Sequence, residues 1–172
     1  MRLYLDTEFT DLVTDPRLIS IGLVADDYRW FYSEIDSDHW YKKASEFVLA
    51  EVWPQMHSYR THFGQETIAQ AAKRLGQWVT KLGEPAQIWC DSDYDWDLLK
   101  ILLGNEWPAN LEREKWVDAS RIECAHGMPQ AKRDYLLRYG LRAHHALNDA
   151  QALRFAVEAV EMATQQKKGG RS

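Results

Sequence analysis

Residues 2 to 8 constrain the fold of this chain more strongly than any other stretch. Their side chains alternate in the manner of a strand, in which successive residues point to opposite faces. One face would carry Leu3, Leu5 and Thr7, and the other Tyr4, Asp6 and Glu8. The carboxylates Asp6 and Glu8 therefore share one face of a strand that otherwise reads as buried. Two acids at the start of a core need an explanation from the rest of the sequence.

Four further stretches have the composition of strands. Residues 17–25 and 29–35 are rich in β-branched and aromatic residues and are separated by the turn-like "DDY", which predicts an antiparallel meander with the first strand. Short strands are also predicted at residues 86–90 and 115–120, and each follows a helical segment. Strands that are joined through helices are usually parallel.

Helices are predicted where apolar residues recur with the helical period. The clearest helix covers residues 66–82, and its apolar stripe consists of Ile68, Ala71, Ala72, Leu75, Trp78, Val79 and Leu82. Other helices are expected at residues 94–104, 130–139 and 145–165. A helix over residues 40–52 is also predicted, with Ser37 or Asp38 as its cap, and it should end at Trp53-Pro54 because proline interrupts helices.

Together these elements predict an α/β fold with a mixed five-stranded sheet, three antiparallel strands plus two parallel ones, flanked by helices. The chain has 172 residues, which is within the usual size of one domain. We expect a single domain over residues 1–166 and a flexible tail over residues 167–172, where "KKGGRS" follows the last helix.

Composition limits the classes of function. The formal charge of −5 argues against binding nucleic acid through a general basic surface. It is compatible with a nuclease, because bound cations reverse the local sign of an acidic site. Cys90 and Cys124 form no C-x-x-C pair, so neither a disulfide framework nor a zinc site is indicated. With no basic leader and no apolar run of about 18 residues, we expect a cytoplasmic protein without a membrane segment.

Further acids, and a pair of histidines, accompany Asp6 and Glu8. "DSDYDWD" (residues 91–97) follows the predicted fourth strand, and "HHALND" (residues 144–149) opens the last helix. Like charges that gather in one place oppose each other's ionisation, and a cation resolves that conflict. Oxygen ligands without cysteine favour Mg²⁺ or Mn²⁺. Two such ions roughly 3.5–4 Å apart support phosphodiester cleavage, and a histidine supplies a base.

Three segments, "DTEFT", "YDWDLL" and "HHALNDA", resemble the three motifs of the DEDDh exonucleases in their order and their separations. This ribonuclease H-like group includes ribonuclease T, oligoribonuclease and the proofreading subunit of bacterial DNA polymerase III. The resemblance covers about residues 2 to 163. It is greatest to the compact bacterial 3′–5′ exoribonucleases. The first and third motifs are specific when taken together, whereas the second is weak by itself.

The resemblance implies that four acids are both catalytic residues and ligands of two Mg²⁺ or Mn²⁺ ions. Asp6, Glu8 and Asp149 follow directly from the motifs. For the fourth acid, Asp95 fits the family pattern through the aromatic residue before it and the leucines three and four places after it. Asp97 remains the alternative, and we interpret Asp91 and Asp93 as capping or solvated residues.

The general base is one of two adjacent histidines. On a regular helix His145 would share a face with Asp149, four residues later. The family pattern has four residues between the histidine and the acid, which selects His144, with the histidine in the loop before the helix. We choose His144 as the base and keep His145 as the alternative.

The activity implied by the resemblance is hydrolysis at the 3′ end of single-stranded nucleic acid, RNA rather than DNA, with release of nucleoside 5′-monophosphates. A water molecule deprotonated by His144 would attack the terminal phosphodiester. The family also suggests that Phe9 and Thr10 touch the terminal nucleotide. Candidates for lining the groove are Trp53, Tyr59, His62 and Phe63, and Arg60 and Arg142 are candidate phosphate contacts.

Two alternatives to this interpretation concern function, and the state of assembly is a separate question. A ribonuclease H-like endonuclease would use a similar sheet and paired metals, although "HHALND" argues against it. A binding module that kept the fold and lost catalysis is a second possibility. The resemblance also implies that a homodimer is one form of assembly to test, because dimers are common among the small members of the family, but no apolar stripe in the sequence requires one.

Overall fold

A computed structural model describes residues 1–12, 15–56 and 64–169 of the chain. Its centre is a five-stranded sheet with the strand order β3-β2-β1-β4-β5. The strands are β1 (Arg2–Phe9), β2 (Leu18–Ala25), β3 (Trp30–Glu34), β4 (Gln87–Cys90) and β5 (Val117–Asp118). β1 pairs antiparallel with β2, and β2 pairs antiparallel with β3. β4 runs parallel to both β1 and β5. The mixed sheet predicted from the sequence is confirmed.

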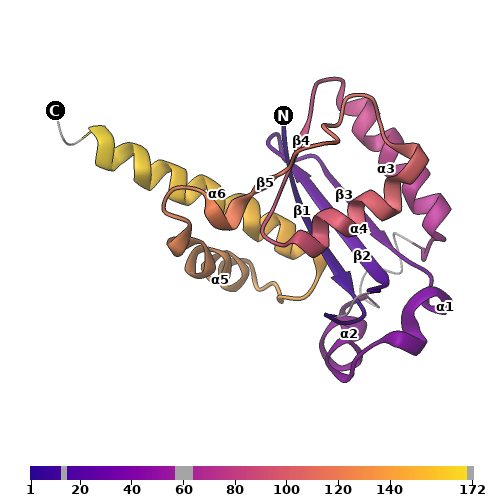
Figure 1. Ribbon diagram of the computed structural model, residues 1–172. Coiled ribbons are helices and arrows are strands. Elements are labelled where there is room, and N and C mark those ends of the chain that lie inside the picture. The colour runs from indigo at the N-terminus through magenta and orange to yellow at the C-terminus, as the bar shows by residue number, and fades with distance from the viewer. Residues whose placement is uncertain (13–14, 57–63, 170–172) are drawn as a thin grey trace.

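Helices cover both faces of the sheet (Figure 1). They are α1 (Ser37–Trp40), α2 (Trp53–Met56), α3 (Ile68–Leu82), α4 (Asp93–Leu103), α5 (Met128–Tyr139) and α6 (Ala146–Gly169). α6 runs through three residues of the segment expected to be a tail. Short 3₁₀ turns cover Tyr41–Lys43, Gly104–Glu106, Ala119–Arg121 and Ala125–Gly127.

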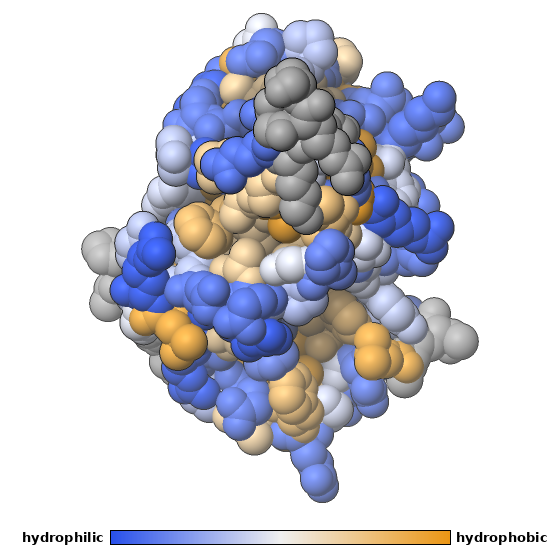
Figure 2. Space-filling model, turned by 90° about the vertical axis from the view of Figure 1, so that its left-hand side faces the viewer, coloured by the Kyte–Doolittle hydropathy of each residue, from blue (hydrophilic) through white to orange (hydrophobic). Residues whose placement is uncertain are grey.

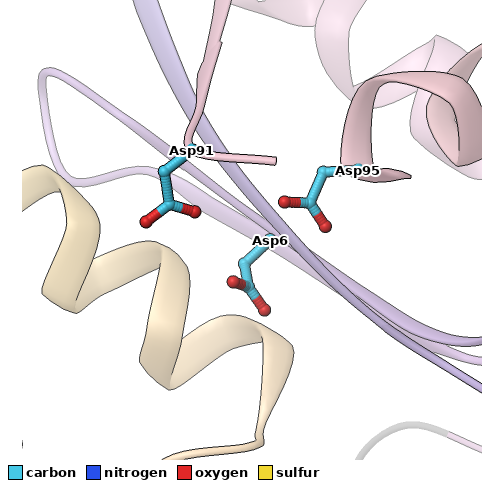
Figure 3. Close-up of side chains that lie close together, drawn as sticks. All are labelled: Asp6, Asp91 and Asp95. Atoms are coloured by element: carbon cyan, nitrogen blue, oxygen red, sulfur yellow. The ribbon is translucent and has the colours of Figure 1, made fainter. Parts of the chain in front are cut away.

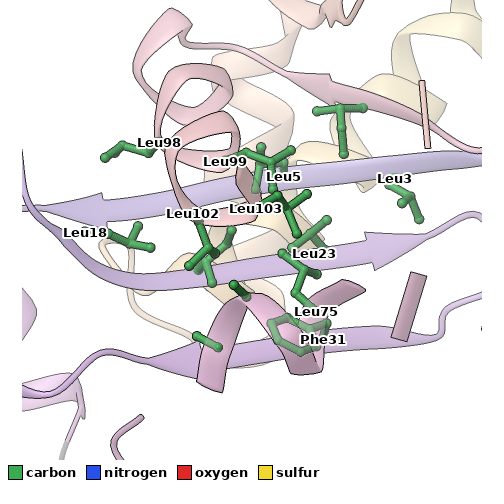
Figure 4. Close-up of a cluster of buried hydrophobic side chains, with 14 of the residues drawn as sticks. Leu3, Leu5, Leu18, Leu23, Phe31, Leu75, Leu98, Leu99, Leu102 and Leu103 are labelled. Carbon is green, nitrogen blue, oxygen red and sulfur yellow. The ribbon is translucent and has the colours of Figure 1, made fainter. Parts of the chain in front are cut away.

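The main core fills the space between the sheet and the pair α3 and α4 (Figure 4). Leu3 and Leu5 of β1 point into it, as the alternation of the strand predicts. The sequence also fixes both ends of α3. Thr67 and Gln70 cap its start reciprocally, and Gly83 ends it with a backbone φ of 78°, a left-handed conformation that glycine adopts without a steric penalty.

The opposite face of β1 is covered by α6. Tyr4 packs there with Leu153 and Val157. The close approach of α6 to the sheet depends on Gly22 of β2, because a Cβ atom at this position would lie 2.5 Å from the carbonyl carbon and oxygen of Ala146. Gly22 is the β-sheet partner of Asp6. The start of α6 is therefore placed directly beside the strand that carries the first acid.

The prediction of one helix over residues 40–52 is wrong. Asp36, rather than Ser37 or Asp38, caps the short helix α1, and Ala44 is extended with φ −68° and ψ 134°. The next helical stretch contains a π turn over Val48–Val52 and leads into α2. Pro54 follows directly after the π turn, and the helical stretch continues to Met56, so the predicted end at Trp53-Pro54 is wrong as well. The sequence pattern showed the proline but not the π turn before it.

Hydrophobic side chains gather in the middle of the molecular face shown in Figure 2, with hydrophilic side chains around them. Among the helices that the structure describes, none is both long enough and apolar enough to cross a membrane.

Candidate active site

A pocket of about 1030 Å³ lies beside the acidic face of β1. Its walls come from the end of β1, the π turn, the start of α5 and the loop before α6. Asp6, Glu8, Asp149 and His144 line it together, although they come from opposite ends of the sequence. The topology brings these residues together because α6 crosses the same face of the sheet on which Asp6 and Glu8 lie.

Asp6, Glu8 and Asp149 form one compact group of carboxylates. One oxygen from each of the three residues lies within 4.8 Å of the others. Asp6 and Glu8 share a face through the two-residue period of β1, and Asp149 is in the first turn of α6. This is the grouping expected for the first and third motifs.

The backbone before α6 sends the two adjacent histidines in different directions. His144 has a φ of 63°, which is uncommon for a residue with a side chain. The N–H groups of His144 and His145 donate to Oδ2 of Asp149 at 2.6 Å and 3.2 Å. Asp149 therefore fixes the turn that precedes its own helix.

His144 is exposed on the wall of the pocket, with its ring edge-on to Phe47 at 4.9 Å between ring centroids. His145 is buried and stacks on Tyr32 at 4.7 Å. Burial lowers the pKa of His145 to about 4, so its ring is neutral at physiological pH. Of the two histidines, the structure brings only His144 to the pocket.

Asp95 and Asp97 occupy different environments on α4. Asp95 is buried, and its Oδ1 accepts hydrogen bonds from the backbone N–H of Thr7 at 3.0 Å and from the Thr7 hydroxyl at 2.6 Å. These bonds tie the start of α4 to β1 between the two motif acids. Asp97 is exposed and pairs with Lys100 at 2.7 Å. The structure thus brings Asp95 to the site and leaves Asp97 on the surface of α4.

Asp91 joins the site although the sequence analysis assigned it a capping or solvated role. Asp6, Asp91 and Asp95 form a second carboxylate group with oxygen atoms within 4.8 Å of one another, and the close-up shows the Asp91 and Asp95 side chains on either side of Asp6 (Figure 3). The register of the two neighbouring strands indicates this position of Asp91. β1 and β4 are parallel with Tyr4 opposite Trp89, and extending that register by two residues places Asp91 opposite Asp6.

A second residue that the sequence analysis missed is Lys132 of α5. Its Nζ lies 3.0 Å from Oδ2 of Asp91, and its side chain lines the same pocket. No local motif marks this lysine, because α5 reaches the site only by packing against α6. The site is therefore an acidic cluster with one ammonium group at its edge.

The carboxylates oppose one another's ionisation. Burial, followed by the charges of Asp95, Asp149 and Glu8, raises the pKa of Asp6 well above its usual range. Burial and the charges of Asp149 and Asp95 raise the pKa of Glu8 to about 8. The pKa of Asp95 rises to about 7, mainly through burial and despite the hydrogen bonds from Thr7. Burial also raises the pKa of Asp149, although Lys132 and the two backbone N–H groups partly offset it.

This donor set fits a hard divalent cation. All five acids offer carboxylate oxygens, and Asp6 belongs to both groups, so two cation positions could share it. Oxygen ligands of this kind favour Mg²⁺ or Mn²⁺ over softer metals. A cation would also remove the repulsion that raises the pKa values of these acids.

The two predicted substrate contacts differ in their environment. Phe9 lines the pocket, and its ring stacks on Tyr94 at 5.2 Å. Thr10 is buried, and its hydroxyl accepts a hydrogen bond from the Arg17 N–H at 3.0 Å. Phe9 is thus available to a ligand, whereas the Thr10 side chain is buried outside the pocket lining and bonded to the Arg17 backbone.

The other candidates for lining the groove or contacting phosphate are only partly described. Trp53 packs against Trp40 and Tyr41, and Arg142 pairs with Glu51 at 3.2 Å. The candidates Tyr59, Arg60, His62 and Phe63 lie outside the described residues.

In sequence, the chain matches no protein-family model and no curated protein. In structure, it is similar to the nuclease domain of 3′hExo, a DEDDh family member, bound to rAMP. That comparison has a TM-score of 0.59 and 14% identity over 93% of this chain and 91% of the other.

Two further structures are similar. One shows the recognition of a histone mRNA stem-loop by a 3′-exonuclease, with a TM-score of 0.58 and 13% identity over 93% of this chain and 81% of the other. The other is a full-length 3′-exonuclease, with a TM-score of 0.57 and 15% identity over 94% and 82%. The chain therefore has the fold of DEDDh nuclease domains, a ribonuclease H-like fold.

Proposed function

We propose that this protein is a metal-dependent 3′–5′ exonuclease that hydrolyses the terminal phosphodiester bond of single-stranded nucleic acid and releases nucleoside 5′-monophosphates. One observation carries the proposal. Asp6, Glu8, Asp95 and Asp149, from β1, α4 and α6, converge beside one pocket, and His144 is exposed on its wall. A purely structural set of acids would more commonly be paired with basic residues or spread over the surface.

In this proposal the four acids hold two Mg²⁺ or Mn²⁺ ions, and Asp91 completes the set. When bound, such ions supply positive charge to the reacting phosphate and make water a stronger nucleophile. His144 accepts the proton of the attacking water, for which its exposed position on the pocket wall is suited. Asp149 orients His144 by fixing the backbone turn through the hydrogen bond at 2.6 Å.

The rest of the pocket suits a nucleotide. Its volume of about 1030 Å³ exceeds that of most small-ligand pockets and leaves room for a terminal nucleotide with part of its neighbour. Phe9, Phe47 and Val48 give it an apolar wall, on which a base can stack or pack. RNA is the proposed substrate because of the motif resemblance. Among the similar structures, one holds rAMP and another recognises a histone mRNA stem-loop.

A cleavage assay tests the proposal. The substrates are a single-stranded RNA and a DNA of the same sequence, each labelled on the 3′-terminal nucleotide, with Mg²⁺ present. The proposal predicts labelled mononucleotide as the first product and faster release from RNA. Asp95→Asn should abolish release, and Asp97→Asn, the matched change two residues away, should leave it unchanged.

The same assay separates the alternatives. Labelled fragments of several lengths would indicate a ribonuclease H-like endonuclease. Retention of the oligonucleotide without cleavage would indicate a binding module that has the fold but not the activity.

A further inference from the structure

Lys132 lines the pocket, and the proposed reaction does not use it. Its ammonium group pairs with Asp91 at 3.0 Å, and the side chains of Lys132 and Asp91 are only 23% and 27% exposed. Ordering a long lysine side chain in this partly buried position costs conformational entropy. Because both side chains are mostly buried, the pair differs from the solvated surface contacts that contribute little.

The ammonium group acts on the whole cluster rather than on Asp91 alone. Asp91, its partner, has a carboxylate oxygen within 4.8 Å of oxygens of Asp6 and Asp95, so the positive charge that pairs with Asp91 also attracts these two carboxylates. Asp6, Glu8 and Asp149 line the same pocket as Lys132. The lysine therefore contributes positive charge where carboxylates gather.

Asp91 belongs to the carboxylate group that it forms with Asp6 and Asp95. A divalent ion at that group and the ammonium group of Lys132 would neutralise the same charges a few ångströms apart, and two cations at this separation repel each other. The next residue, Arg133, also lines the pocket, but it is exposed and its Nη2 donates to Oε1 of Gln130 at 2.8 Å.

We propose that Lys132 is the internal counter-ion of the acidic cluster: it neutralises Asp6, Asp91 and Asp95 in the ion-free protein and competes with the divalent ion for them. Lys132 thereby sets the ion concentration at which the site fills. This inference rests on the proposed function, because it takes the carboxylate cluster to be the metal site.

Calorimetric titration with Mn²⁺ tests the inference without any measurement of activity. Lys132→Met should bind Mn²⁺ at least about fivefold more tightly than the wild type, the change that removing a repulsion of about 1 kcal/mol produces. Its ion-free form should unfold at a lower temperature, because the cluster has lost its counter-ion. A structural defect would weaken ion binding instead, so the expected direction distinguishes the two explanations.

Two controls accompany the titration. Lys132→Arg keeps the charge and should bind Mn²⁺ within about twofold of the wild type. Arg138→Met makes the same change of net charge on the same helix, at an exposed residue outside the pocket lining, and should also leave the affinity within about twofold. Lys132→Gln repeats the loss of charge if the methionine variant does not fold.

The outcomes separate this inference from the proposed function. Suppose that the wild type binds Mn²⁺ and that Lys132→Met and Lys132→Gln bind it equally well or more weakly. This result overturns the role of Lys132 and leaves the proposed function standing. Equal tightening in Lys132→Arg also overturns it, since charge would not be the cause. If the wild type itself binds no Mn²⁺, the proposed function fails as well.

Discussion

Replacing Asp95 by asparagine should stabilise the ion-free protein at alkaline pH while removing a residue that the proposed reaction requires. Asp95 is 3% exposed, and one of its oxygens accepts both hydrogen bonds from Thr7. The amide oxygen of asparagine can accept the same two bonds. The substitution therefore removes the buried charge and keeps the local contacts.

The magnitude follows from the shift of the Asp95 pKa from 3.8 to about 7. The native protein keeps the Asp95 proton to higher pH than the unfolded chain does, so between these two pKa values it binds more protons. The free energy of unfolding therefore falls as the pH rises. At a little over 1 kcal/mol per pKa unit, the charge of Asp95 costs about 2 kcal/mol at pH 5 and about 4 kcal/mol at pH 8. The wild type should thus lose about 2–3 kcal/mol through this residue between the two pH values.

Thermal and urea unfolding in the presence of a chelator measure this effect. For a chain of this length the difference corresponds to roughly 5–10 °C in Tm. Asp95→Asn should show a correspondingly shallower decline between pH 5 and pH 8. Adding Mn²⁺ at pH 8 should stabilise the wild type strongly and the variant much less. Parallel pH profiles for the two proteins would refute the argument that Asp95 carries an unfavourable charge in the ion-free site.

Two further predictions concern the histidines and the packing of α6. His144→Ala should reduce the cleavage rate about 10²- to 10⁴-fold in the labelled-substrate assay without lowering Tm. His145→Ala should lower the free energy of unfolding by about 1–3 kcal/mol and retain cleavage. Loss of cleavage in His145→Ala alone would reverse the assignment of the general base. Gly22→Ala should destabilise the protein by at least about 2 kcal/mol in urea, because the new methyl group would lie 2.5 Å from the backbone of Ala146. Gly64→Ala, where no described atom lies within 4 Å of the added Cβ, should change the stability by less than about 0.5 kcal/mol, and equal effects of the two substitutions would contradict the close packing of β2 and α6.

The sheet and the long helices could be predicted from the sequence because their signals are local. The alternation in β1 placed Asp6 and Glu8 on one face, and the stripe in residues 66–82 predicted α3. The segment around Ala44 could not be predicted in this way. Its extended backbone is accompanied by a hydrogen bond from the Ser45 N–H to the Thr10 carbonyl, a contact between residues far apart in the sequence.

The residues of the candidate site also differ in whether a local sequence signal could predict them. Motif spacing led to Asp6, Glu8, Asp95, Asp149 and His144, which the structure brings together. Local helix geometry would have favoured His145, and it failed because the turn at His144 precedes the helix. Asp91 was missed although the strand register could have indicated it. Lys132 could not be predicted from the sequence, since its position depends on how α5 packs against α6.

The most direct test of the account is calorimetric titration of the folded protein and of Asp6→Asn with Mg²⁺ and with Mn²⁺. Asp6 is the residue that both carboxylate groups share, so its loss affects every cation position that the structure suggests. The account predicts uptake of ions by the wild type and little or no uptake by the variant, with both proteins folded by circular dichroism. No uptake by the wild type, or equal uptake by the two proteins, would contradict the claim that these carboxylates form a metal site.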